Sequence, residues 1–467
     1  MSHSPLPLAV IGAGFSGTMT ALNLIAHAPD RRVLLCERGP TFARGAAYST
    51  ADPVHLLNVR ASNMSAYPTR PNDFTEWLSR QDDIPSGHRH EMPAGLFVSR
   101  AVYGRYLSHL VQKELSCADG AARLRIVPDE GVALHRRSDD SYTLTLSGGR
   151  EHRVAGAIVA IGNLIEEKSA LGGPIVRDPW AVRFTDGLID GRPVVIVGTG
   201  LTTADVVTSL WVSGFSGPVL AISRRGLLPR THVSPAPWRL SRFGGTAREP
   251  LSRLVRLFRQ EVEDARRTGL PWQSVMDAAR PITVSLWRGL TSVQRARFIR
   301  HLRPWWDVHR HRMAPPVAQQ LHGLIEQDFL RVAAGKMVSA AESGPNSVEV
   351  CWAPRDGTGP ETITAQRVIY ATGATAVSSV QDALVTGLLD SGMARIDPLG
   401  LGLDVTADLE IVGAGGDVSP TLWAIGPTVR GAFWECTAVP DIRADAERLA
   451  KRIATTLAAA EGSRMSP

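Results

Sequence analysis

Hydrophobic positions form two kinds of pattern along this chain. Continuous apolar runs of strand length occur at Leu8–Ile11 and Val194–Val197, and such runs are typical of strands buried on both faces of a parallel sheet. Each run leads into a glycine-containing turn and then into a helical stretch, Thr18–Ala26 or Ala204–Val212. A further apolar run follows each helical stretch. The pattern therefore predicts two strand–turn–helix–strand units of the α/β type.

Elsewhere the periodicity changes. Short alternating runs predict strands at 123–127, 132–135, 142–146 and 154–161. Residues 240–330 are predicted to be helical, because Leu251–Arg267 and Ser292–Leu302 carry apolar residues three and four apart. Strands return from about Ala340. A last helix is expected near Pro440, since proline is favoured in the first turn of a helix.

The first turn has the pattern of a dinucleotide site. Gly12 permits a tight turn, Gly14 lets the backbone approach a pyrophosphate, and Gly17 allows close packing of helix on strand. The helix N-terminus then offers free N–H groups to the phosphates. Glu37 lies 20 residues after Gly17 at the end of the second strand, where a carboxylate can bond ribose hydroxyls.

The second turn has a looser form of the same pattern. Gly198 and Gly200 are present, but Thr203 replaces the third glycine. At the position of Glu37 the second unit carries Arg224 and Arg225 just after a serine. Arginine there can bind the 2′-phosphate of NADPH. The alternative is that both are surface arginines of an arginine-rich chain.

Composition narrows the function classes. The net charge is +6 and only four of the 51 basic residues are lysine, but the arginines are scattered without a basic tail, so nucleic-acid binding is not expected. No apolar run approaches the roughly 18–20 residues that span a bilayer, and no signal-peptide pattern precedes Leu8. The four cysteines are far apart and include no C-x-x-C pair. We therefore expect a cytoplasmic protein without a dithiol centre or a membrane partner.

The segment Pro304–Met313 combines two tryptophans and two histidines. Trp305 and Trp306 are interpreted as core or lid packing in preference to a stacking platform. His309 and His311 are two residues apart and so do not share a helix face. No metal site is expected.

Several segments together resemble one family of two-dinucleotide-binding flavoproteins. They are Gly45–Thr50, His55–Val59, Asn63–Ala66, Ser223–Arg230, Gly426-Pro427 and Arg430–Glu435. The family contains FAD-dependent urate hydroxylases and flavin-dependent aspartate N-monooxygenases, and the resemblance runs from about residue 8 to 455. It implies an α/β fold with two Rossmann-like units, in which a discontinuous FAD domain (1–165 and 337–467) holds an inserted NAD(P)-binding domain with a helical segment (166–336).

The resemblance also implies FAD in the first unit and NADPH or NADH in the second. The cofactor contacts expected beyond Gly12, Gly14, Gly17, Glu37, Gly198, Gly200, Thr203, Arg224 and Arg225 are Phe15, Ser16, Arg38, Tyr48, Asn58, Met64, Ser65, Val132, Gly162, Thr202, Gly373 and Gly426.

Three departures separate the chain from neighbouring families. Disulfide reductases of the superfamily need a redox cysteine pair, which is absent. The Phe-x-Gly-x3-His-x3-Trp-like segment of Baeyer–Villiger enzymes is absent too, because Gly173–Trp180 keeps a tryptophan but no histidine. The usual C-terminal Gly-Asp ligand of the flavin is missing where the strand 422–425 runs into Gly426.

The resemblance implies an FAD-dependent, NAD(P)H-consuming monooxygenase that oxygenates a small polar substrate through a C4a-(hydro)peroxyflavin. Urate is the leading substrate, aspartate the second, and O2 the co-substrate. No nucleophilic triad is required, since the cofactor supplies the chemistry. Candidate substrate residues are Arg60, as an anion-binding group, and His232 and Trp434, though each also fits an ordinary structural role. A flavin reductase or dehydrogenase without oxygenation, or a flavin-binding sensor, are the alternatives; the oligomeric state is not predicted.

Overall fold

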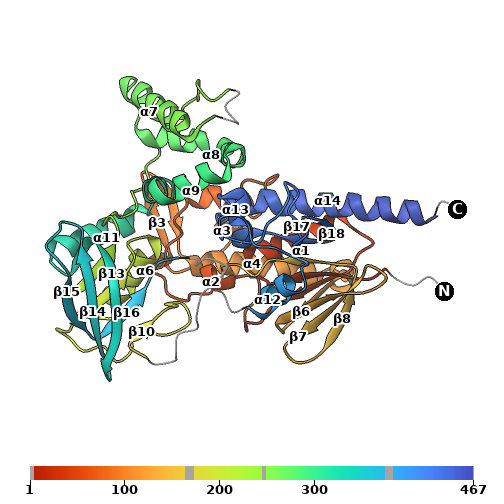
Figure 1. Ribbon diagram of the computed structural model, residues 1–467, viewed down its shortest axis with the longest axis horizontal. Helices are drawn as coiled ribbons and strands as arrows, with labels where there is room; N and C mark the ends of the chain where they lie inside the picture. The colour runs from red at the N-terminus through yellow and green to blue at the C-terminus, as the bar shows by residue number, and fades with distance from the viewer. Residues whose placement is uncertain (1–4, 164–172, 245–248, 374–381, 466–467) are drawn as a thin grey trace.

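The computed structural model describes residues 5–163, 173–244, 249–373 and 382–465 (Figure 1). Two parallel-cored sheets lie side by side, and a group of helices projects from them.

The first sheet is built from both ends of the chain. Its six strands follow the order β17, β18, β9, β1, β2, β5, and all neighbours are parallel except β17 and β18. The strands are β1 (Leu8–Ile11), β2 (Val33–Cys36), β5 (Leu124–Val127), β9 (Gly156–Val159), β17 (Glu410–Val412) and β18 (Val418–Ala424). Strands β1, β2 and β9 are buried at every position, which agrees with the continuous apolar runs of their sequences.

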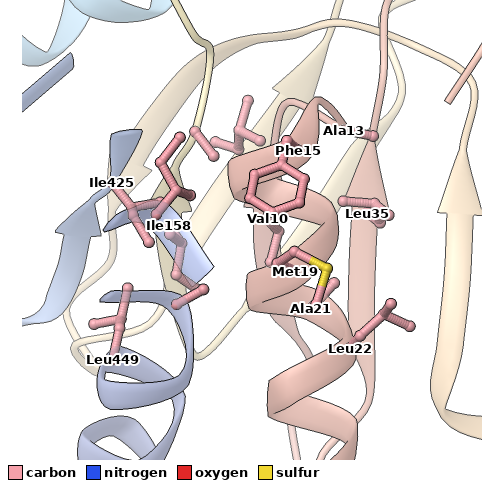
Figure 2. Packing of buried hydrophobic residues seen from close by; sticks show 14 of the residues in the cluster. Val10, Ala13, Phe15, Met19, Ala21, Leu22, Leu35, Ile158, Ile425 and Leu449 are labelled. Carbon is pink, nitrogen blue, oxygen red and sulfur yellow. The ribbon is translucent and has the colours of Figure 1, made fainter. Parts of the chain in front are cut away.

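Helix α1 (Phe15–His27) packs on this sheet and against α14 (Val439–Met465), with α4 (Arg100–Ser116) nearby. Figure 2 shows Met19 of α1 among Val10, Leu35 and Ile158 of the strands and Leu449 of α14, all in one apolar cluster. The N-terminal strand–helix unit and the C-terminal helix therefore share a core.

The second sheet has seven strands in the order β10, β16, β11, β12, β13, β14, β15. The pairs from β10 to β13 are parallel, and the pairs from β13 to β15 are antiparallel. The strands are β10 (Ile175–Val176), β11 (Val194–Val197), β12 (Val219–Ser223), β13 (Leu330–Gly344), β14 (Ser347–Pro354), β15 (Glu361–Ala365) and β16 (Arg367–Tyr370). Helices α6 (Leu201–Val212) and α11 (Pro315–Glu326) pack with it.

The helical segment that follows β12 in the chain agrees with its predicted range. It contains α7 (Leu251–Arg267), α8 (Trp272–Gly289), α9 (Ser292–His301) and α10 (Arg303–Arg310). Figure 1 shows α7 and α8 standing away from both sheets. A capping box of Thr291 and Gln294 begins α9. Trp287 of α8 donates from Nε1 to the carbonyl oxygen of Gly431 at 2.9 Å, which ties the segment to the C-terminal part of the first unit.

The remaining elements are short. Two small antiparallel sheets contain β3 (Arg89–Met92) with β4 (Gly95–Val98), and β6 (Gly131–Arg136) with β7 (Tyr142–Leu146) and β8 (Glu151–Val154). The further α-helices are α2 (Gly45–Tyr48), α3 (Asp73–Ser79), α5 (Ala118–Arg123), α12 (Ala383–Asp390) and α13 (Arg430–Phe433). The 3-10 helices include η1 (Ala61–Asn63), η2 (Ser86–His88) and η4 (Gly426–Val429).

The arrangement confirms the predicted fold class, with two Rossmann-like units and the second inserted into the first. The expected boundary at 336/337 is displaced, because β14, β15 and β16 still pair within the second sheet up to Tyr370. Alternating strands show the same periodicity on either sheet, so their pattern could not tell which sheet they extend. The expected boundary at 165/166 lies outside the described residues.

The single strand expected at 154–161 is wrong. Val154 ends β8 opposite Tyr142, whereas Gly156 begins β9 opposite Leu8. Ala155 lies between them and donates its N–H to the carbonyl oxygen of Pro7. One continuous apolar pattern therefore crosses from the antiparallel sheet to the parallel one.

Packing at Gly17 generates a test of the first unit. A Cβ at Gly17 would overlap the backbone carbonyl of Gly12, so Gly17→Ala should lower the free energy of unfolding by about 1–3 kcal/mol. Gly87→Ala is the matched control, because a Cβ there meets no atom within 4 Å. Urea unfolding of both variants measures the difference, and equal stabilities would contradict this packing.

Candidate functional site

The first glycine loop lies at the carboxyl end of β1. Gly12 has φ of 101°, and a Cβ there would lie 2.5 Å from the carbonyl oxygen of Ala160, at the end of β9. Gly14 is the N-cap of α1, and no side chain caps this helix. Its first N–H groups, beginning with those of Phe15 and Ser16, are therefore left for an anion.

Glu37 lies beside this loop at the carboxyl end of β2. Its Oε2 accepts from the N–H of Ala13 at 2.9 Å, and its Oε1 accepts from the N–H of Gly39 at 2.9 Å. A carboxylate has further lone pairs for ribose hydroxyls. Arg38 instead pairs with Glu130 at 3.3 Å on the surface.

The second loop repeats this geometry. Gly198 has φ of 124°, and a Cβ there would lie 2.5 Å from the carbonyl oxygen of Ala371, at the end of β16. Gly200 is the N-cap of α6, again without a side-chain cap. Thr203, in place of the third glycine, is buried with its hydroxyl unpartnered in the described structure. Thr202 is half-buried one residue before it.

The two units differ at the end of their second strand. Register places Cys36 opposite Ile11 and Ile222 opposite Val197, so Ser223 takes the position of Glu37. Ser223 accepts a hydrogen bond from the Thr199 hydroxyl at 2.8 Å. Arg224 is exposed just beyond it, and the Arg225 guanidinium lies 5.6 Å from the ring centre of Trp305. The second loop thus lacks a carboxylate at this position and has two cations beside it.

The ends of the adjacent strands also match. Gly162 and Gly373 both have φ of 78°, and a Cβ at either would meet no atom within 4 Å. Val132 lies half-buried on β6. Gly426 has φ of 82° and contacts the Ser16 side chain at the start of α1, so η4 comes to the first loop where a Gly-Asp ligand was missing.

The family-like segment lines the same unit. Tyr48 packs edge-on against Tyr103 at 4.8 Å, Met64 is buried, and Asn58 is half-buried. The Ser65 hydroxyl already donates to the carbonyl oxygen of Arg70 at 2.6 Å, which gives it a structural role. Cofactor contact by these residues stays a prediction.

Arg60 and His232 are brought together, and with them Arg310 and Arg312; we call these four residues the cationic cluster. The N–H of His232 donates to the carbonyl oxygen of Met313 at 2.9 Å, which joins the segment after β12 to the end of α10. The Arg60 Nη1 lies 3.3 Å from the Ser234 hydroxyl. The first unit, the second unit and the helical segment therefore all contribute to one site.

Donors in this cluster lack partners. Within the described residues, Arg60 Nε and the Nε and Nη1 of Arg312 are buried donors without a hydrogen bond. Arg312 also pairs with Asp277, and Arg310 with Glu435 at 3.1 Å. Unsatisfied buried donors are costly, so they mark a place where a ligand anion would be stabilised.

Burial, together with the charges of Arg312, Arg60 and Arg310, lowers the pKa of His232 to about 3, although a backbone hydrogen bond with Asn58 acts in the opposite direction. His232 is therefore neutral at physiological pH and leaves the positive charge to the arginines.

Trp434 lies elsewhere. It is buried against Trp287 of α8 with ring centres 4.9 Å apart, and its φ of 60° is an outlier for a bulky residue. Trp434 therefore belongs to an apolar contact with Trp287 and is not part of the cationic cluster.

Sequence reasoning missed Arg310 and Arg312. They belong to the densest arginine stretch, whose one distinguishing signal was its mixture with tryptophan and histidine. Their position depends on pairing of residue 231 with 313, which no local pattern predicts.

Neither a membrane span nor a metal cluster is found in the described part of the chain. No described helix is long and apolar enough to cross a bilayer. No group of three histidine, cysteine or acidic residues there is placed to hold a metal ion.

Comparison with known proteins gives a family match for the N-terminal unit. Residues 9–164 match the family model described as FAD-NAD(P)-binding, so this part is a dinucleotide-binding domain. Curated protein sequences give no significant match.

Solved structures share the whole fold at low identity. L-lysine 6-monooxygenase from Pseudomonas syringae is 15% identical with a TM-score of 0.65, covering 97% of this chain and 100% of the other. Ornithine N-hydroxylase from Kutzneria sp. 744 is 14% identical with a TM-score of 0.59, covering 98% and 100%. Thioredoxin reductase from Lactococcus lactis is 10% identical with a TM-score of 0.52, covering 97% and 99%. The predicted resemblance to two-dinucleotide-binding flavoproteins is thus confirmed for the fold.

The depressed pKa of His232 predicts a pH effect on stability. The unfolded chain protonates this histidine near pH 6.5, whereas the folded chain does so only near pH 3, so stability is lost as pH falls through this window. One proton contributes at most about 1.4 kcal/mol per pH unit. The difference in free energy of unfolding between the native protein and His232→Gln should therefore shrink toward low pH. Urea unfolding across the window measures it; exposed His301→Gln is the control, and a pH-independent difference would rule out a buried neutral His232.

Proposed function

We propose that this protein is an FAD-dependent, NADPH-consuming monooxygenase that N-hydroxylates a small anionic amino acid of the aspartate type. The observation that carries the proposal is the pair of glycine loops with matching geometry and opposite charge beside them. Glu37 suits the ribose of FAD, and Arg224 with Arg225 suits the 2′-phosphate of NADPH.

The residues present fit both dinucleotides. Each loop brings an uncapped helix N-terminus to a strand end, with a glycine where a Cβ would strike the neighbouring carbonyl. The redox and oxygen chemistry belongs to the FAD and nicotinamide that these loops would hold. The chain itself binds, orients and shields them from water.

The substrate class is argued from charge. The cationic cluster offers buried donors from Arg60 and Arg312 that match carboxylate oxygens. The fold relatives named as lysine and ornithine hydroxylases favour an amino acid over urate as the compound oxygenated. Arg60, which has no acidic partner among the described residues, would repel a basic side chain and favour an acidic one.

Urate hydroxylation remains the second candidate, since urate is also a small anion and the cluster would accept it. Disulfide reduction is disfavoured, because the four cysteines include no C-x-x-C pair. A flavin reductase with another acceptor, or a sensor, is distinguished by the ratio of O2 consumed to product formed.

Arg60 provides the test of the substrate site. Arg60→Ala should raise the KM for aspartate about 10- to 100-fold, by loss of a charge-assisted bond. It should also increase the share of NADPH that ends as hydrogen peroxide, because a loosely held substrate is oxygenated less often. Flavin content should not change, and Arg297→Ala, an exposed arginine on α9, is the control.

Product analysis by mass spectrometry, with O2 and NADPH consumption, gives the readout for aspartate and urate. Product from urate alone would reverse the order of substrates. Absence of coupled product with any small anion would overturn the monooxygenase proposal in favour of a reductase.

The Arg224 and Arg225 pair provides the test of the second loop. Replacing both with glutamine should raise the KM for NADPH by about 5- to 150-fold, since up to two charge-assisted bonds to a phosphate are lost. The KM for NADH should stay nearly unchanged, because NADH has no 2′-phosphate. Equal effects on both cofactors would assign the arginines to the shared pyrophosphate or to structure.

A further inference from the structure

A cavity lies within the helical segment, and no residue of either glycine loop lines it. Its volume is about 740 Å³, and its walls come from α7, α8, α9 and α10, with Trp434 as one wall residue. We call it the helical pocket. The helices that form it project from the two sheets in Figure 1.

The pocket is apolar because each helix turns one face toward it. On α7 the lining residues Leu251, Leu254, Val255, Phe258 and Val262 follow the three-and-four spacing of one helix face. Leu251, Val255, Phe258 and Val262 are only half-buried in the folded chain. The folded helical segment therefore leaves part of this apolar face uncovered.

The pocket and the cationic cluster share no residue. Leu302, Trp305, Trp306 and His309 line the pocket at α10. Arg310 is not among the lining residues and pairs with Glu435, whose other carboxylate oxygen accepts from the Trp306 Nε1. The two sets of residues are therefore distinct, although α10 contributes to both.

Trp434 makes the wall toward the body of the protein. Its ring stacks on Trp287 at 4.9 Å and meets Phe298 edge-on at 5.2 Å. The guanidinium of Arg430 lies 4.7 Å from the same ring, and that of Arg303 lies 5.9 Å from it. The Arg430 Nε is buried without a hydrogen-bond partner among the described residues.

The charges around the pocket favour a negative ligand end. Arg259 also lines it, whereas the lining acid Glu263 already pairs with Arg266 at 2.9 Å. Glu435, next to Trp434, accepts from the Trp306 Nε1 at 2.8 Å and pairs with Arg310. The acids are thus engaged, whereas Arg259 has no ion pair among the described residues.

We propose that the helical pocket binds an elongated apolar carboxylate, with its chain among the aromatic walls and its carboxylate at the exposed edge of the pocket beside Arg259. The volume falls in the range of roughly 300–1,000 Å³ that small-molecule sites occupy, and concave apolar walls with a few polar groups are typical of such sites. A protein partner would need a broad accessible face, whereas here the apolar residues of α7 point toward those of α8 and α10. This site goes beyond the proposed oxygenation and does not depend on it.

Five of the eleven tryptophans line the pocket: Trp272, Trp287, Trp305, Trp306 and Trp434. Decanoate added to the full-length, FAD-loaded protein should therefore change the tryptophan emission in a saturable way. Decanol should bind about tenfold more weakly because it lacks the charge, and butyrate should have no effect. Equal affinities for decanoate and decanol would overturn the carboxylate assignment.

Substitutions test whether the change in tryptophan emission comes from the helical pocket. Phe258→Asp should abolish the decanoate response by placing a charge on the apolar wall, and Val293→Asp, on an exposed part of α9, should leave it intact. Val262→Phe, which fills the pocket without adding charge, should also abolish the response and guards against misfolding of the aspartate variant. Arg259→Gln should weaken decanoate about tenfold and leave decanol unchanged.

Absence of saturable binding by decanoate to protein with full flavin content would overturn the proposal. So would a concentration-dependent dimer that Phe258→Asp dissociates, because a second copy would then cover the pocket. All these measurements omit NADPH, so their failure would leave the proposed oxygenation untouched, and failure of oxygenation would leave the pocket untouched.

Discussion

The structure depends on two places where a glycine meets the carbonyl end of a neighbouring strand. Gly12 lies against Ala160 and Gly198 against Ala371, each too close for a side chain. This contact fixes where the chain turns from strand to helix, and so it fixes the direction in which α1 and α6 present their N-termini. The cofactor loops, the position of Glu37 and the site between the two units all follow from it.

The two glycine loops have equivalent backbones but differ in the charges beside them. A carboxylate lies beside the first loop, and a serine followed by two arginines lies beside the second, while the strand pairing around both is the same. Between the units, Arg310 and Arg312 have acidic partners whereas Arg60 has none among the described residues, and burial keeps the nearby histidine neutral. The chain thus assigns different anions to different places with one architecture.

The sequence predicted the parts of the fold that are set by local pattern. Both strand–loop–helix units and the range of α7 follow from periodicity and glycine spacing, because these signals act within a few residues. Strands β14 and β15 lie in the range expected for the first unit but extend the second sheet, since an alternating pattern carries no information about the partner strand. Arg312 was missed for a related reason: its neighbour His232 is 80 residues away in the chain, and only tertiary pairing joins them.

The pairing of β9 with β18 has a consequence for synthesis of the chain. Ala157 of β9 lies opposite Leu422, and everything between them, including the entire second unit, must be translated before this pair can form. At the roughly 5–20 residues per second of translation, β9 remains an unpaired edge for tens of seconds. An apolar edge strand is a template for association with other chains during that time. The second sheet lies wholly between residues 175 and 370, so its pairing can be complete before β18 is made, whereas completion of the first sheet waits for the last part of the chain.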